Sequence, residues 1–150
     1  MTTPAMSPSM SMPARLVGAL LCLGVAAIHV IDQGGIPGSK TPTYVGIGYY
    51  ILEIIAILTA IWLVARPTRA AWFVTIGVAA GPLLGYVLSR GPGLPDYTDD
   101  RGNWTEPLGL LSLFVEGVLL VLSATLFLRR TRIDGASESA PRHAASQVDA

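Results

Sequence analysis

Four long apolar runs, separated by short segments rich in proline, glycine and charge, dominate this chain of 150 residues. The runs cover about 16–31, 44–65, 70–89 and 108–128. A bilayer core of ~30 Å needs about 20 apolar residues in helical form, and backbone polar groups in lipid must pair within their own segment. No run alternates apolar and polar residues with period two, as a half-buried strand would. The pattern therefore predicts an all-α protein, a bundle of four transmembrane helices.

Composition agrees with this pattern. Apolar residues make up 51% of the chain, and charged residues make up only 13%, about half the share of a soluble protein. The formal net charge of zero gives no reason to expect a nucleic-acid partner. Cys22 is the one cysteine, so no internal disulfide can form. The expected surroundings are a lipid bilayer.

The chain divides into a membrane domain and two polar ends. Residues 1–14 are rich in Met, Ser, Thr and Pro, which predicts a disordered N-terminal tail. Residues 15–130 hold the four spans. Residues 131–150 are small and polar with mixed charge, which predicts a second disordered tail on the cytoplasmic side.

Basic residues near the ends of the spans predict the orientation, because cytoplasmic flanks carry an excess of Lys and Arg. Seven basic residues lie on one side of the membrane: Arg15, Arg66, Arg69, Arg129, Arg130, Arg132 and Arg142. The other side receives three, which are Lys40, Arg90 and Arg101. We therefore expect a multi-pass protein of the plasma membrane with both termini in the cytoplasm.

The first apolar run has a second interpretation. Arg15, the apolar stretch after it and Val25-Ala26-Ala27 together resemble a secretory signal peptide with a cleavage site. Cleavage would leave three spans and an N-terminus outside the cell. The long leading segment and the continuation of the apolar run past residue 27 favour an uncleaved first span.

The spans form two hairpins, each running from inside to outside and back, and the hairpins share a short pattern. Gly35-Ile36-Pro37 in the first outer loop matches Gly93-Leu94-Pro95 in the second. Each loop is followed by a span with one glutamate, Glu53 or Glu116, ~13 Å below the outer end at 1.5 Å per residue. The matches are consistent with an internal duplication, and equally with chance and common loop chemistry.

The two glutamates need an explanation, because a carboxylate facing lipid costs roughly 2.5–3.5 kcal/mol on insertion scales. Glu53 and Glu116 should face the bundle interior, be protonated, or both. Tyr50 precedes Glu53 by three residues and Ser112 precedes Glu116 by four, so each lies beside its carboxyl on the same helix face. The glutamates are candidates for hydrogen bonds that join helices, or for a functional polar site that includes Tyr86 on the third span.

His29 lies in the last turn of the first span, and Asp32 follows three residues later on the same face. A histidine oriented by a carboxylate can bind a metal or relay protons. The alternative is a histidine at the level of the lipid head groups that has no special partner.

The third span carries Gly77, Gly81 and Gly85, spaced four apart as in faces of close helix–helix contact. Pro82 lies at mid-span and leaves one carbonyl without its helical donor. The glycines are predicted to form a packing face. The alternative is a bent helix that opens a cavity beside the glutamates.

A resemblance extends over residues 15–130. The resemblance rests on Leu88-Ser89-Arg90, Gly93-Leu94-Pro95, Glu106-Pro107-Leu108-Gly109 and Glu116, together with His29 late in the first span. With these the chain resembles an uncharacterised family of small four-span integral membrane proteins from actinobacteria. The resemblance implies the fold and the membrane setting. The Asp-Asp-Arg-Gly-Asn insert at 99–103 departs from that family by lengthening the outer loop.

No P-loop, H-E-x-x-H or G-x-S-x-G motif is present. The first hypothesis is therefore a non-enzymatic accessory or partner-binding subunit that associates with another membrane protein or with a second copy. The second is a carrier, or a protein that handles protons, metals or redox equivalents through its intramembrane carboxylates and His29. A membrane enzyme ranks third. The sequence specifies no cofactor and no metal.

Overall fold

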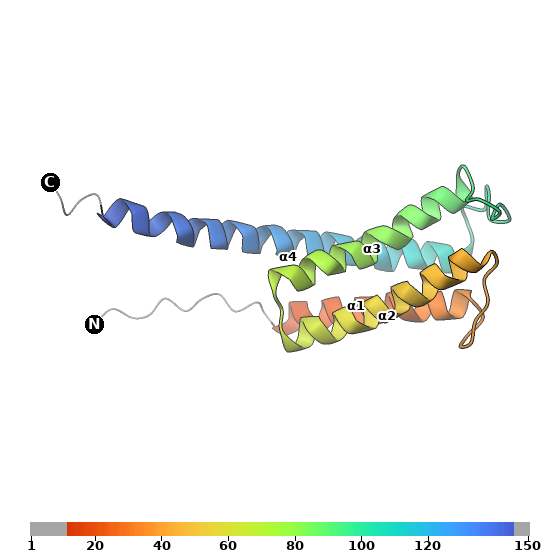
Figure 1. The fold of residues 1–150 in the computed structure, drawn as a ribbon, viewed down its shortest axis with the longest axis horizontal. Coiled ribbons are helices and arrows are strands. Elements are labelled where there is room, and N and C mark those ends of the chain that lie inside the picture. The colour runs from red at the N-terminus through yellow and green to blue at the C-terminus, as the bar shows by residue number, and fades with distance from the viewer. Residues whose placement is uncertain (1–11, 146–150) are drawn as a thin grey trace.

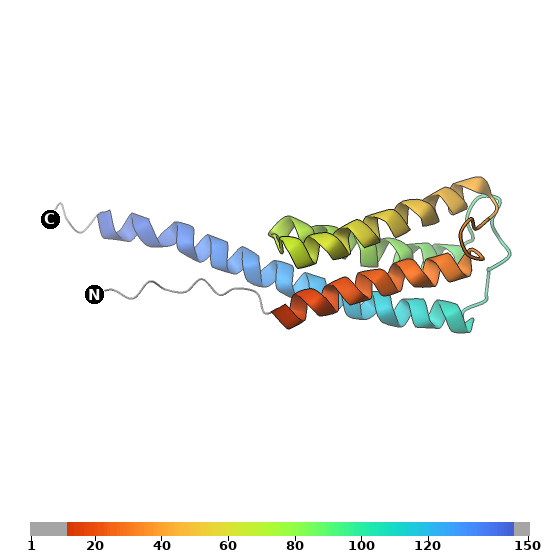
Figure 2. The same ribbon diagram turned by 90° about the horizontal axis from the view of Figure 1, so that it is seen from below.

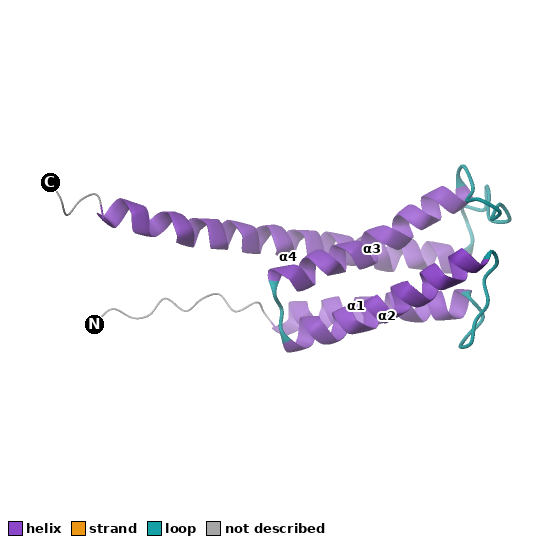
Figure 3. Cartoon of the chain, in the orientation of Figure 1, coloured by secondary structure: helices purple, strands orange, loops and turns teal. Residues whose placement is uncertain are grey.

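The computed structural model describes residues 12–145, with side chains through residue 132. The predicted N-terminal tail therefore lies mostly outside the described residues. Four helices make up the described part of the chain: α1 (Met12–Asp32), α2 (Thr43–Ala65), α3 (Arg69–Arg90) and α4 (Pro107–Ala145). Figure 3 shows helices joined by loops and no strand over this range.

All four helices are long and apolar enough to cross a membrane, α4 through its segment Pro107–Arg132. The predicted all-α bundle of four spans is thereby confirmed. This is a multi-pass membrane protein.

Two boundaries differ from the prediction. Helix α1 begins at Met12 inside the predicted N-terminal tail, and α4 continues to Ala145 inside the segment 131–150 that was predicted to be disordered. Extending an existing helix by one residue costs far less than starting a new one. Polar composition alone therefore did not locate the end of α4, which projects beyond the other helices in Figure 1.

The helices form two hairpins packed side by side. Helix α1 packs chiefly on α2, α3 chiefly on α4, and α1 also contacts α4 and α3. Figures 1 and 2 show the long loops 33–42 and 91–106 together at one end of the bundle, which we call the loop end. The short turn 66–68, the start of α1 and the projecting part of α4 lie at the opposite end, which we call the terminal end.

The core of the bundle lies in its terminal half. Trp72, Leu63 and Cys22 are completely buried there, from α3, α2 and α1. The contact between α1 and α3 is close, because a Cβ atom added at Gly18 would lie 3.0 Å from Cη2 of Trp72 and 3.2 Å from Cδ1 of Leu63. A glycine in α1 thus makes room for the indole.

Hydrogen bonds to helix ends reinforce the terminal end. The guanidinium of Arg15 on α1 donates to the carbonyl oxygens of Leu63 (3.1 Å) and Val64 in the last turn of α2. Those carbonyls lack helical donors and carry the negative end of the helix dipole. The hydroxyl of Thr68 accepts from the amide of Ala71 at 3.1 Å and caps the start of α3. Arg15 therefore ties α1 to the end of α2, and Thr68 closes the first turn of α3.

We predict that Gly18→Val destabilises the bundle, because the added atoms collide with Trp72 and Leu63. Overpacking of this kind costs about 1–3 kcal/mol. Thermal unfolding in mild detergent should show a lower Tm. The matched control is Gly117→Val on α4, where an added Cβ meets nothing within 4 Å. An equal Tm for the two variants would contradict the close α1–α3 contact.

Candidate binding cavity

A cavity of about 710 Å³ lies between α2 and α3 and extends toward the loop end. Ile51, Leu52 and Ile55 of α2 and Val74 and Ile76 of α3 make up much of its apolar wall. Its polar lining comes from every helix and from the second loop: His29, Asp32, Tyr44, Tyr49, Tyr86, Ser89, Arg90, Tyr97, Asp100, Glu106 and Ser112. The cavity therefore has one apolar part and one polar part.

The glycines of α3 that were predicted to form a packing face lie along the cavity. Gly77, Gly81 and Gly85 all line the cavity, and a Cβ at any of them would meet nothing within 4 Å. Within residues 12–132 these glycines therefore bring no other helix close, and a packing role against a helix of another chain stays a prediction. Pro82, inside α3, cannot donate to the carbonyl of Val78, and such a proline bends or breaks a helix.

The deep polar part of the cavity contains His29, which is 7% exposed. Its Nδ1 lies 2.9 Å from the carbonyl oxygen of Val25. A carbonyl only accepts, so we assign the ring hydrogen to Nδ1. The other ring nitrogen, Nε2, lies 4.0 Å from Oε1 of Glu116, which is beyond hydrogen-bond distance. The ring of Tyr49 packs edge-on against the imidazole with 5.0 Å between centroids.

Each glutamate has its own hydrogen-bond partner. Oε1 of Glu116 accepts from the hydroxyl of Ser112 at 2.5 Å, which confirms the neighbour expected from their spacing. Oε1 of Glu53 accepts from the side-chain amide of Gln33 at 2.9 Å, a bond between α2 and the residue that follows α1. Within residues 12–132 no hydrogen bond or ion pair joins Glu53 to Glu116. The sequence pattern shared by the two hairpins therefore does not extend to the contacts of Glu53 and Glu116.

Asp32 does not orient His29 by a hydrogen bond. Its Oδ2 accepts from the hydroxyl of Tyr49 at 2.6 Å and lies 3.1 Å from Nζ of Lys40 in the first loop. The ammonium of Lys40 also lies 5.7 Å from the centroid of the Tyr49 ring. This group joins the end of α1 to α2 and fixes the tyrosine that packs on His29.

Arg90, the last residue of α3, closes the rim of the cavity. Its guanidinium lies 2.8 Å from Oε2 of Glu106 and 3.4 Å from Oδ2 of Asp100, with its carbon 4.2 Å from the centroid of the Tyr86 ring. Asp100 also accepts from the hydroxyl of Tyr97 at 2.6 Å. One cation thus links α3 to the second loop and to the start of α4.

The surroundings of Tyr97 keep it a hydrogen-bond donor. Burial raises the pKa of its phenol, and the bond to the Asp100 carboxylate raises it further. The phenol therefore remains protonated at neutral pH and keeps its bond to Asp100. The hydroxyl of Tyr44 donates to the carbonyl of Pro95 at 2.6 Å, so the second loop is also tied to α2. The loop is held over the cavity from both sides.

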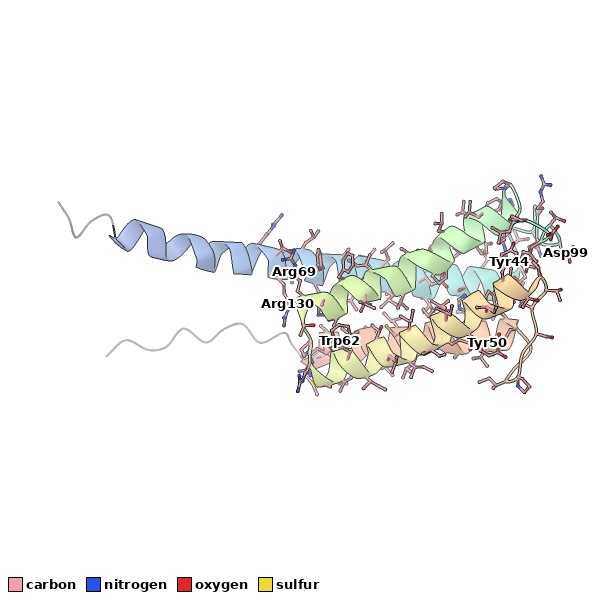
Figure 4. All side chains as sticks on the ribbon, viewed as in Figure 1. Tyr44, Tyr50, Trp62, Arg69, Asp99 and Arg130 are labelled. Atoms are coloured by element: carbon pink, nitrogen blue, oxygen red, sulfur yellow. The ribbon has the colours of Figure 1, made fainter. Side chains whose placement is uncertain are left out.

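The structure brings part of the predicted polar site together. His29, Asp32 and Tyr86 line the cavity, and Glu116 lies directly behind His29 and Ser112. Tyr50 does not line the cavity, and its hydroxyl bonds the backbone of Gly38 in the first loop and not Glu53. Figure 4 labels Tyr50 near the loop end of the bundle. Glu53 does not line the cavity.

Sequence reasoning missed three residues of this region. Gln33 was not considered, although a buried amide directly after an apolar span is a natural partner for a glutamate on the next span. Arg90 was interpreted only as a basic residue of the outer side and as part of the family resemblance, and Tyr49 was given no role in the predicted site. Within the described residues no group of three or more His, Cys, Asp or Glu side chains comes together as a metal site would require.

Comparisons with protein families, with curated proteins and with solved structures found no match for this chain. The interpretation of the site therefore rests on its geometry.

We predict that Arg90→Gln loosens the second loop, because Asp100 and Glu106 lose their shared cation. Leaving such groups without their partner costs roughly 1–3 kcal/mol. Hydrogen exchange of the amides in 91–106 should become faster, and Arg101→Gln, which removes an exposed arginine of the same loop, should leave it unchanged. Equal exchange in the two variants would mean that Arg90 does not hold the loop.

Proposed function

We propose that this chain is a non-enzymatic membrane protein that binds an amphipathic molecule taken from the bilayer, in a storage or carrier role. The polar end of that molecule occupies the deep part of the cavity near His29. Its apolar tail lies between α2 and α3. This proposal develops the carrier hypothesis that the intramembrane polar residues suggested.

One observation carries the proposal: a single cavity joins a lateral apolar opening to a buried polar part. Ile51 and Ile55 of α2 and Gly77 and Gly81 of α3 line the cavity and are exposed on the surface of the bundle. In a membrane-spanning segment, such a surface faces lipid. A molecule dissolved in the bilayer can therefore enter sideways, whereas Arg90 and its partners restrict the route through the loop end.

The second candidate function is a partner-binding subunit, and the uncovered glycines favour it. Gly77, Gly81 and Gly85 leave room for close approach, which is how small-residue faces receive another transmembrane helix. A helix of another membrane protein, or of a second copy, would then occupy the same opening. The two candidates differ in the mass of what occupies the cavity.

Mass spectrometry of the protein released from mild detergent tests the proposal. We expect wild-type protein to carry one small adduct from the membrane, and Gly81→Phe to lose it, because the ring fills the opening between α2 and α3. Gly117→Phe is the matched control, since Gly117 is also a helical glycine with open space around it and lies outside this cavity. A bare wild-type protein, or an adduct retained by Gly81→Phe, would contradict the proposal; a bound polypeptide would favour the second candidate.

We further propose that the terminal end faces the cytoplasm of the cell and the loop end faces outward across the plasma membrane. Figure 4 shows Arg69, Arg130 and Trp62 at the terminal end, with Tyr44 and Asp99 at the loop end. Basic residues on the inner side and aromatic residues near both interfaces are typical of this orientation. The polar part of the cavity, with His29, Asp32 and Arg90, then lies toward the outer side of the membrane.

The orientation has a direct test with reporters fused to the two ends of the chain. We expect fluorescent-protein fusions at both termini to be active inside the cell, and alkaline phosphatase fusions at both to be inactive. A fusion in the loop 91–106 should give the opposite result. Reporters on opposite sides at the two termini would refute this orientation and the four-span topology together.

A further inference from the structure

We propose that the head group bound in this cavity is a neutral hydroxyl that donates a hydrogen bond to Nε2 of His29. The inference rests on the proposed function and names the chemical class of its ligand: a lipid-soluble phenol or alcohol. It follows from one acceptor atom, from the pairing of the charges around it, and from the shape of the cavity.

The acceptor is Nε2 of His29. The bond between Nδ1 and the carbonyl of Val25 fixes the tautomer, so Nε2 of the neutral ring carries a lone pair. Within residues 12–132 no group lies within hydrogen-bond distance of Nε2, since Oε1 of Glu116 is 4.0 Å away. The side chain is more than nine-tenths buried and lines the cavity. An acceptor on a largely buried side chain is unfavourable without a donor, and an occupant of the cavity can supply one.

The charges around the cavity favour a neutral head group. Arg90 is paired with Asp100 and Glu106, and Asp32 is paired with Lys40. Glu116, the carboxyl nearest to His29, is 1% exposed, does not line the cavity and accepts from Ser112. The charged side chains that line the cavity near His29 are thus already paired. A charged head group there would have no free partner, and a buried unpaired charge is costly.

The shape of the cavity accommodates an apolar tail. From His29 the cavity runs along Ile51 and Ile55 on α2 and along Gly77 and Gly81 on α3. The glycines present no side chain, so the groove is deep enough for a hydrocarbon chain or ring. The ring of Tyr49 beside the imidazole gives an aromatic head group a partner. An alkylphenol matches each of these features.

The test compares 4-nonylphenol with 4-nonylanisole, its methyl ether, which has the same tail and ring but no donor. Saturable binding of each to the full chain in lipid vesicles is measured by equilibrium dialysis. We expect the phenol to bind roughly tenfold more tightly, because the ether leaves Nε2 without a donor. In His29→Phe the two probes should bind with equal affinity. Tyr50→Phe, which removes a hydroxyl outside the cavity, should keep the preference.

A second measurement does not depend on a variant of His29. The chain holds two histidines, so His143→Gln leaves His29 as the sole imidazole. In that protein the ¹⁵N resonance of Nε2 should move when 4-nonylphenol is added and stay in place when 4-nonylanisole is added. An unchanged resonance with bound phenol would overturn the assignment to His29.

The outcomes separate this inference from the proposed function. If phenol and ether bind equally and Gly81→Phe abolishes both, the cavity binds amphipathic molecules and the hydroxyl inference is wrong. If dodecylammonium binds more tightly than the phenol, the head group is cationic and the inference is also wrong. If neither aromatic probe binds saturably and the wild-type protein carries no adduct, the proposed function itself fails.

Discussion

Polar groups placed inside a membrane must find partners, and in this protein Asp32 at the end of α1 and Gln33 directly after it supply partners to two side chains of α2. His29, Asp32 and Gln33 face Glu116 on α4, Tyr49 on α2 and Glu53 on α2 in turn. A carboxylate without such a partner costs roughly 2.5–3.5 kcal/mol at the centre of a spanning helix. The hydrogen bonds of Asp32 and Gln33 therefore orient α2 against the end of α1.

The two halves of the bundle are packed differently. In the terminal half, Trp72 of α3 and Leu63 of α2 pack closely against Gly18 of α1, and Arg15 binds the end of α2. In the loop half, α3 presents glycines where a large side chain would fill the gap. A well-packed half anchors the helices, and an open half is free to hold a ligand. Arg90 closes the loop end of that half.

The two glutamates, which look equivalent in the sequence, have different roles in the structure. Glu53 bonds Gln33 away from the cavity, as an interhelical fastening would. Glu116 lies behind the one deep histidine of the cavity and is held by Ser112. The first is an example of the structural hypothesis and the second belongs to the candidate site. The Gln33–Glu53 bond fits the interhelical hypothesis for Glu53, whereas a functional role for Glu116 stays a prediction.

The four spans, their hairpin order and the Ser112–Glu116 bond were all predictable, because they depend on hydropathy and on spacing within one helix. Contacts between helices were not. The glycines of α3 have the spacing of a packing face, yet only the tertiary structure showed that no helix of this chain fills it. Likewise Tyr50 and Tyr49 differ by one position, about 100° of rotation, and this rotation places Tyr49 against His29 and Tyr50 under the first loop. A sequence records the position of each residue along its own helix, whereas the rotation of one helix against another is set by the packing of all of them together.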